Sequence, residues 1–304
     1  MNIQGSALLE NLKQNNCKAT IIPIHFLEKL QQDMKSLYNS KLLNNNLIRK
    51  YLNDFHYDYS AVLPNAQSII VAAIPQPITI LRFIWQKKER KIIVPPTYIY
   101  TEAEKFVFNI VKNGLSQENY SVIQGKLPLK ILAVRSGLSQ YGKNNISYIS
   151  GMGSFYRLTA LIADMPYDTV TWHDIQMMAH CNECWACLNS CPTKCIDRNN
   201  NIIDASRCLT YINESSEPFP NWINYTWHNS LVGCMRCQLA CPQNRDHNII
   251  KDVKNFLSES DIDILLHKDD FDKLPRKTHD LLRKVNLTDY ELTILQRNLK
   301  ALLT

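Results

Sequence analysis

The chain of 304 residues has little glycine and little proline, with 8 and 13 residues, whereas 45% of its residues are hydrophobic and 20% are charged. Collagen-like and mucin-like proteins need far more glycine or proline, and a wholly disordered chain is much less hydrophobic. The composition therefore predicts a globular protein. The length suits one larger domain and one smaller module.

Long apolar runs are also absent. The longest one covers residues 69–74, far short of the roughly 20 apolar residues that a membrane-spanning helix requires. Residues 1–30 contain neither the apolar stretch nor the cleavage site of a secretory signal. No internal repeat and no low-complexity tract is present. We therefore expect a protein without a membrane contact, located in the cytoplasm.

The first part of the chain carries the patterns of a mixed α/β domain. Continuous β-branched runs that end at prolines predict strands over residues 67–74 and 91–94. Capping residues and glycine stops predict helices over residues 101–112 and 129–136. A further helix is expected over residues 155–163, after a turn at residues 151–154.

The domain organisation follows from these patterns. We expect an α+β protein with an N-terminal α/β domain over residues 1–172, a ferredoxin-like module over 173–247 and a short helical tail over 248–304. Residues 1–172 hold 19 Lys and Arg against 11 Asp and Glu, and the remainder holds 15 against 17. The basic first part suits a polyanionic partner or a phosphate-bearing cofactor, and equally a solvated lysine-rich surface.

Nine of the ten cysteines lie between Cys181 and Cys241, and only Cys17 stands apart. Thiols gathered in this way in a reducing compartment are typical of metal ligands. The first run, Cys-x2-Cys-x2-Cys-x3-Cys-Pro from Cys181 to Pro192, has the spacing of bacterial ferredoxins, in which three thiolates hold one [4Fe–4S] cube and the fourth serves a second one. A tetrahedral zinc site, the alternative, would leave half of the cysteines unexplained.

The second run, Cys-x2-Cys-x3-Cys-Pro from Cys234 to Pro242, lacks a first cysteine because Leu231 occupies that position. Cys195 and Cys208 are the candidates for the missing ligand. We interpret Cys195 as a packing residue and predict that Cys208 is the ligand, with His180 a non-ligand. The predicted sets are Cys181, Cys184, Cys187 and Cys241 for one cluster, and Cys191, Cys208, Cys234 and Cys237 for the other.

Five segments together resemble the epoxyqueuosine reductase family. These segments are GLSQYGKNN (137–145), GMGSFYRL (151–158), CNECWACLNSCPTKCID (181–197), RCLTY (207–211) and GCMRCQLACPQN (233–244). The resemblance implies a double-cluster domain attached to an α/β domain related to the corrinoid-binding domain of reductive dehalogenases. It also implies a cobalamin near the loop Gly142, Lys143 and Asn144, although the same residues suit a plain tight turn.

The family's proton-donating aspartate has no counterpart, because the corresponding residues 124–129 contain no carboxylate. No catalytic residue is assigned, and we expect cobalamin binding without turnover of epoxyqueuosine. The sequence thus predicts an iron-sulfur oxidoreductase that takes electrons from a donor such as ferredoxin or flavodoxin and reduces a small molecule or a modified base, with tRNA as a further partner. The alternatives are an electron carrier or reductive activator without a catalytic site, and a nucleic-acid-binding protein whose clusters are structural.

Overall fold

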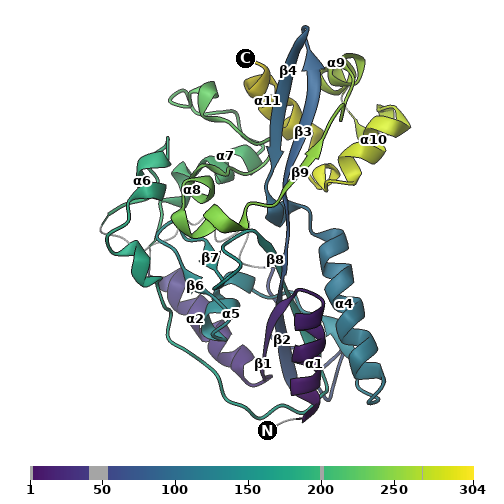
Figure 1. Ribbon diagram of the computed structural model, residues 1–304, viewed down its shortest axis with the longest axis vertical. Coiled ribbons are helices and arrows are strands. Elements are labelled where there is room, and N and C mark those ends of the chain that lie inside the picture. Colours follow the sequence, from purple (N-terminus) through teal and green to yellow (C-terminus); the bar gives the residue numbers. More distant parts are fainter. Residues whose placement is uncertain (1–2, 41–53, 199–201, 269) are drawn as a thin grey trace. The chain divides into compact units, whose positions relative to one another are not determined.

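The computed structural model describes residues 3–40, 54–198, 202–268 and 270–304 (Figure 1). The chain divides into two compact units. The first unit comprises Met1–Pro75 and Glu102–Cys184, and the second comprises Gln76–Thr101 and Trp185–Thr304. Residues 76–101 thus group with the C-terminal part of the chain. The domain boundaries at residues 172 and 247 stay a prediction.

The first unit is built on a four-stranded antiparallel sheet. Its strand order is β1 (Lys18–Pro23), β2 (Ser68–Pro75), β8 (Tyr156–Ala163) and β5 (Val122–Gln124). β2 is buried from Ser68 to Ala73, because helices cover both faces of the sheet. The strand expected over residues 67–74 is confirmed.

Alternate residues of the central strands enter two separate cores. Ile70, Ala72 and Leu161 face α1 (Ile3–Gln14) and α4 (Thr101–Ser116). Ile69, Val71 and Ile162 face α2 (Phe26–Asn39) and α5 (Leu129–Arg135). Figure 1 shows α1 and α4 side by side. The period of two along each strand therefore produces a layer of helices on each face.

The helix expected over residues 155–163 is wrong, because this segment is the strand β8. Seven of its eight residues are buried, so the run carries no alternation of apolar and polar residues that would mark a strand. A short continuous apolar run has the same appearance in a buried helix and in a fully covered strand. The helices expected at residues 101–112 and 129–136 are confirmed as α4 and α5.

The second unit contains a three-stranded sheet in the order β4 (Lys88–Val94), β3 (Ile78–Trp85) and β9 (Ile250–Val253). Strands β3 and β4 form a hairpin whose turn residues Gln86 and Lys87 both have positive φ, as a two-residue type I′ turn requires. Leu81 and Phe83 of β3 pack in one core with the C-terminal helices α9 (Glu259–His267), α10 (Arg276–Arg283) and α11 (Leu292–Leu303).

The cysteine-rich segment has only short elements between its turns. Its helices are α6 (Ala186–Ser190), α7 (Leu209–Glu214) and α8 (Arg236–Leu239), and its 3-10 turns are η2 (Ala179–Cys181), η3 (Ala205–Arg207), η4 (Tyr225–Trp227) and η5 (Pro242–His247). Other short elements are η1 (Pro96–Tyr98), η6 (Phe271–Lys273), η7 (Leu287–Asp289), β6 (Gln140–Tyr141) and β7 (Ser147–Tyr148). Across the described ranges, no helix combines the length and the apolar character needed to cross a bilayer.

Candidate iron-sulfur site

The two cysteine runs share one local design. Helices α6 and α8 each begin two residues after a cysteine, Cys184 or Cys234, and each includes the next cysteine of its run. Cys191 and Cys241 follow these helices in extended conformation, because each precedes a proline that disfavours the helical region. Both runs therefore leave the helical conformation after their three-residue spacing.

Helices α6 and α8 are linked through a serine. The Ser190 hydroxyl lies 3.0 Å from the carbonyl oxygen of Cys187 and 3.4 Å from that of Arg236. Cys187, Cys208 and Cys237 pack against a small buried cluster formed by Cys191, Cys195 and Ile196. The fold of the second unit therefore gathers cysteines from three separate segments of the chain.

The centre of this cluster is a chain of three thiols. The Sγ atoms of Cys191 and Cys195 lie 3.5 Å apart, and Cys195 also forms a side-chain hydrogen bond with Cys208. These contacts lower the pKa of Cys191 to about 5 and that of Cys208 to about 7. They raise the pKa of Cys195. The two predicted ligands are therefore the thiols that most readily become thiolates, the form that binds metals.

Cys234 packs against the buried residues Leu209, Ile212 and Ile223. Burial raises the pKa of its thiol to about 12, with smaller contributions from the charges of Cys208 and Cys191. Three of the four cysteines predicted for one cluster, Cys191, Cys208 and Cys237, thus pack together, whereas Cys234 packs in a separate cluster.

The other predicted set is divided between the two units. Cys187 and Cys241 belong to the second unit, whereas Cys181 and Cys184 end the first unit. His180, predicted not to be a ligand, is exposed. In the described part of the chain, no group of three or more His, Cys, Asp or Glu side chains is arranged to hold a single metal ion. The assignment of both sets of ligands stays a prediction.

Buried amides of other elements hold the cysteine loops. Asn298 of α11 donates from Nδ2 to the carbonyl oxygens of Asn213 and Leu231, at 2.7 Å each. Asn213 in turn donates to the carbonyl oxygen of Gly233, at 2.8 Å. A Cβ atom at Gly233 would lie 2.7 Å from the Tyr98 ring, and its φ is +71°. These contacts fix the residues directly before Cys234.

Sequence reasoning missed these supporting residues. The signal available for Asn298 is its place in α11, among the buried Leu295, Leu299 and Ala301. A polar residue within an apolar helix face needs a hydrogen-bonding partner when it is buried. Its partners are backbone carbonyls about 67 and 85 residues earlier in the chain, which the sequence does not identify.

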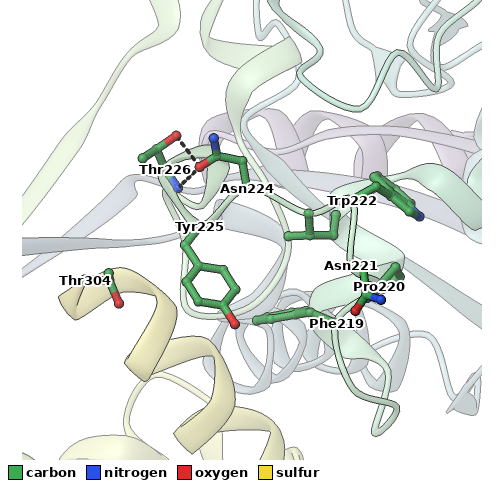
Figure 2. Close-up of a pocket in the computed structure, with 9 residues that line it drawn as sticks. Phe219, Pro220, Asn221, Trp222, Asn224, Tyr225, Thr226 and Thr304 are labelled. Atoms are coloured by element: carbon green, nitrogen blue, oxygen red, sulfur yellow. Dashed lines mark hydrogen bonds between the residues drawn. The ribbon is translucent and has the colours of Figure 1, made fainter.

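A shallow cavity of about 640 Å³ lies beside this part of the second unit (Figure 2). Its lining is residues 219–226 and Thr304, and it includes Phe219, which packs in the same cluster as Cys234. Trp222 and Tyr225 are 44% and 49% exposed. The guanidinium of Arg207 lies 5.4 Å from the Trp222 ring and that of Arg297 lies 4.2 Å from the Phe219 ring.

The predicted cofactor loop is a tight turn between β6 and β7 in the first unit. The backbone amide of Gly142 donates to the carbonyl oxygen of Ile146 at 2.8 Å. Asn144 is 4% exposed, and its Nδ2 donates to the Tyr148 hydroxyl at 3.0 Å. A Cβ atom at Gly142 would lie 2.6 Å from the Tyr148 ring. Gly142 and Asn144 thus serve the turn itself, while Lys143 is half-buried.

The segment that lacks a carboxylate follows β5. Gln124 donates from Nε2 to Thr159 Oγ1 at 2.9 Å and to the Ala160 carbonyl oxygen at 3.2 Å. The backbone amide of Lys126 donates to the Tyr59 hydroxyl at 2.7 Å. The polar groups of this segment therefore bond within the first unit, and none of its side chains is an acid.

Comparison with known proteins supports the prediction of iron-sulfur clusters. The 4Fe-4S double cluster binding domain family matches residues 180–244. The epoxyqueuosine reductase of Aliivibrio fischeri is 31% identical over 182 residues, which cover 58% of this chain and 48% of that protein. The chain spans about half the length of the curated relatives it matches. The resemblance noted in the sequence is confirmed.

Solved structures confirm the fold class. The structure of epoxyqueuosine reductase from Streptococcus thermophilus matches 100% of this chain and 81% of its own, with a TM-score of 0.69 and 19% identity. An epoxyqueuosine reductase solved with an epoxyqueuosine-modified tRNA-Tyr stem loop matches 98% of this chain and 80% of its own, with a TM-score of 0.66 and 20% identity. The mixed α/β architecture with a double-cluster domain is therefore shared with these proteins.

Proposed function

We propose that this chain, which resembles epoxyqueuosine reductases and matches the 4Fe-4S double cluster binding domain family over residues 180–244, is an oxidoreductase that passes electrons through two [4Fe–4S] clusters to a site in its N-terminal domain. The observation that carries the proposal is the packing of Cys191, Cys208 and Cys237 in one cluster, although they come from three separate segments. The donor set fits the cluster, because iron-sulfur cubes are held by cysteine thiolates.

The proposed ligands are those that the cysteine spacing predicts. Cys191, Cys208, Cys234 and Cys237 hold one cluster, and Cys181, Cys184, Cys187 and Cys241 hold the other. When bound, the two clusters supply one-electron transfer. The chain's own part is to exclude water from the thiolates, through the buried neighbours Ile196, Leu209 and Ile223, and to place the loops through Asn213 and Asn298.

A modified base in tRNA is the substrate class that we propose. The epoxyqueuosine reductase that was solved with a modified tRNA stem loop shares this fold, and the basic excess of residues 1–172 suits a polyanionic partner. The test is to incubate the reconstituted protein and a reductant with an epoxyqueuosine-containing stem loop, and to measure both binding at several salt concentrations and the reduced base by mass spectrometry.

The outcomes of this test separate the alternatives. Salt-dependent binding with turnover establishes epoxyqueuosine as the substrate, and binding without turnover retains the tRNA partner but excludes this base. No binding by protein with intact clusters contradicts the tRNA proposal and favours the electron carrier, which the absence of a carboxylate in residues 124–129 supports. Rapid electron transfer to a partner protein, without any substrate of its own, would then identify the carrier.

Cobalamin dependence has no support from the loop that the resemblance indicated. The Asn144 side chain bonds within the turn, and Gly142 lies close to the Tyr148 ring, so both residues serve the turn itself. The prediction that cobalamin binds near Lys143 is tested by anaerobic titration with cob(II)alamin. A spectral change at about one cofactor per chain, weakened by Lys143→Ala, would support it. The absence of any change at micromolar cofactor would contradict it.

A further inference from the structure

A ninth cysteine lies inside the predicted site of the cluster assigned to Cys191, Cys208, Cys234 and Cys237, which is called the second cluster below. Cys195 is 4% exposed, and its Sγ lies 3.5 Å from the Sγ of Cys191. Its side chain also bonds with that of Cys208. The eight predicted ligands do not include Cys195, yet it touches two of them.

The backbone holds Cys195 between these two neighbours. The amide of Lys194 donates to the carbonyl oxygen of Cys191 at 3.3 Å, and Lys194 has a φ of +54°, which is unfavourable for a residue with a side chain. The carbonyl oxygen of Cys195 accepts from the amide of Asp204 at 2.9 Å, four residues before Cys208. The turn and this bond together place the thiol between both predicted ligands.

We propose that Cys195 is a positioning residue that raises the reduction potential of the second cluster, by donating its S–H hydrogen bond to the ligand sulfurs of Cys191 and Cys208. This inference rests on the proposed function, because it requires that Cys191 and Cys208 hold that cluster. The single thiol proton can be donated to either sulfur, and both are acceptors once metal binding has removed their protons.

The effect on the potential has a simple electrostatic cause. Reduction adds one electron to the cluster, so its ligand sulfurs carry more negative charge in the reduced state. A hydrogen-bond donor stabilises that state more than the oxidised one, and hydrogen bonds to sulfur are among the factors that set cluster potentials. The site is shielded from solvent, since Cys191 and Ile196 are only 7% and 5% exposed. The low local dielectric constant strengthens the hydrogen bond.

The test compares Cys195→Ala with Cys195→Ser, and uses Cys17→Ala as the matched control. Cys17 is equally buried, at 2% exposure, but it packs in the first unit against Leu12 and Ile21. In a redox titration followed by electron paramagnetic resonance, we expect Cys195→Ala to lower the midpoint potential of one cluster only. Cys195→Ser retains a donor and keeps most of the parent potential, and Cys17→Ala changes neither potential.

A second measurement starts from the parent protein and detects the thiol proton directly. Electron-nuclear double resonance of the reduced protein in H₂O and D₂O should detect an exchangeable proton beside one cluster, and this signal should be missing in Cys195→Ala. Full iron content with unchanged potentials and an unchanged proton signal would overturn the inference.

Loss of one whole cluster in Cys195→Ala would also overturn it, because Cys195 would then be a ligand. Failure of the proposed function appears differently. In that case the parent protein itself would not hold two clusters, whatever residue occupies position 195.

Discussion

The sheet of the first unit and the cysteine segment of the second unit are stabilised by different kinds of interaction. In the first unit, β2 and β8 contribute alternate apolar side chains to a core on each face of one sheet. In the second unit, α6 and α8 contain no fully buried residue, and the cysteine loops are held by amide bonds from Asn213 and Asn298. The first unit can form from apolar burial alone, whereas the cysteine segment needs its metal to remain ordered.

Removal of iron should therefore give the largest difference between the two regions. We expect an iron chelator under anaerobic conditions to remove the hydrogen-exchange protection of residues 185–247, because metal-ligand bonds supply much of the folding free energy of such segments. The amides of β2 and β8 should retain their protection. Equal loss of protection in both regions would show that the first unit also depends on the clusters.

Replacement of a single ligand is a more local change. Cys208→Ser should leave about four iron per chain of about eight, because one cube loses a thiolate. Cys17→Ser, in the first unit, should leave the iron content unchanged, since Cys17 only packs among apolar residues. The iron content and the paramagnetic resonance spectra of the two variants test these expectations. Retention of about eight iron in Cys208→Ser would show that another residue is the fourth ligand.

The buried amide of Asn298 should matter for the second unit as much as a core side chain matters for the first. Asn298→Ala removes the donor to the Leu231 carbonyl oxygen and leaves the Asn213 carbonyl oxygen only the Arg297 guanidinium, at 3.3 Å, at a cost of about 1–3 kcal/mol in the free energy of unfolding. We expect it to weaken iron retention during dialysis.

The matched change in the first unit is Leu132→Ala, since Leu132 is fully buried in the core on the α5 side. It should cost about 2–5 kcal/mol in the free energy of unfolding, and iron should be retained. A loss of iron in Leu132→Ala equal to that in Asn298→Ala would show that iron retention does not depend specifically on the amide that holds the cysteine loops.

The smallest effect concerns His228, which is 7% exposed and lies 4.8 Å from the Phe219 ring, measured between ring centroids. Burial lowers the pKa of His228 to about 4, with further contributions from Arg297 and Arg236. The unfolded chain therefore binds a proton at a higher pH than the folded chain does, so stability is lost as the pH falls below about 6.5. The loss reaches about 3 kcal/mol at most.

His228→Phe removes this contribution to the pH dependence of the free energy of unfolding. Relative to the variant, the parent protein should lose stability in urea unfolding between about pH 7.5 and 5.5. A constant difference between the two proteins over this range would show that His228 is not held in its neutral form.

The sequence identified the features that depend on local pattern. Cysteine spacing indicated both cluster runs, and proline-bounded apolar runs indicated β2 and part of β4. The strand β8 was mistaken for a helix because it is covered on both faces. The strand β3 was not predicted, and its grouping with helices more than 170 residues later depends on long-range packing. The contact between Cys195 and Cys208 likewise arises only from the fold.

The iron content of the intact protein tests the central claim most directly. After anaerobic purification and reconstitution, two cubes predict about eight iron per chain, and reduction should give the paramagnetic resonance signals of two interacting [4Fe–4S] clusters. A content near four iron, or one equivalent of zinc in place of iron, would contradict the account.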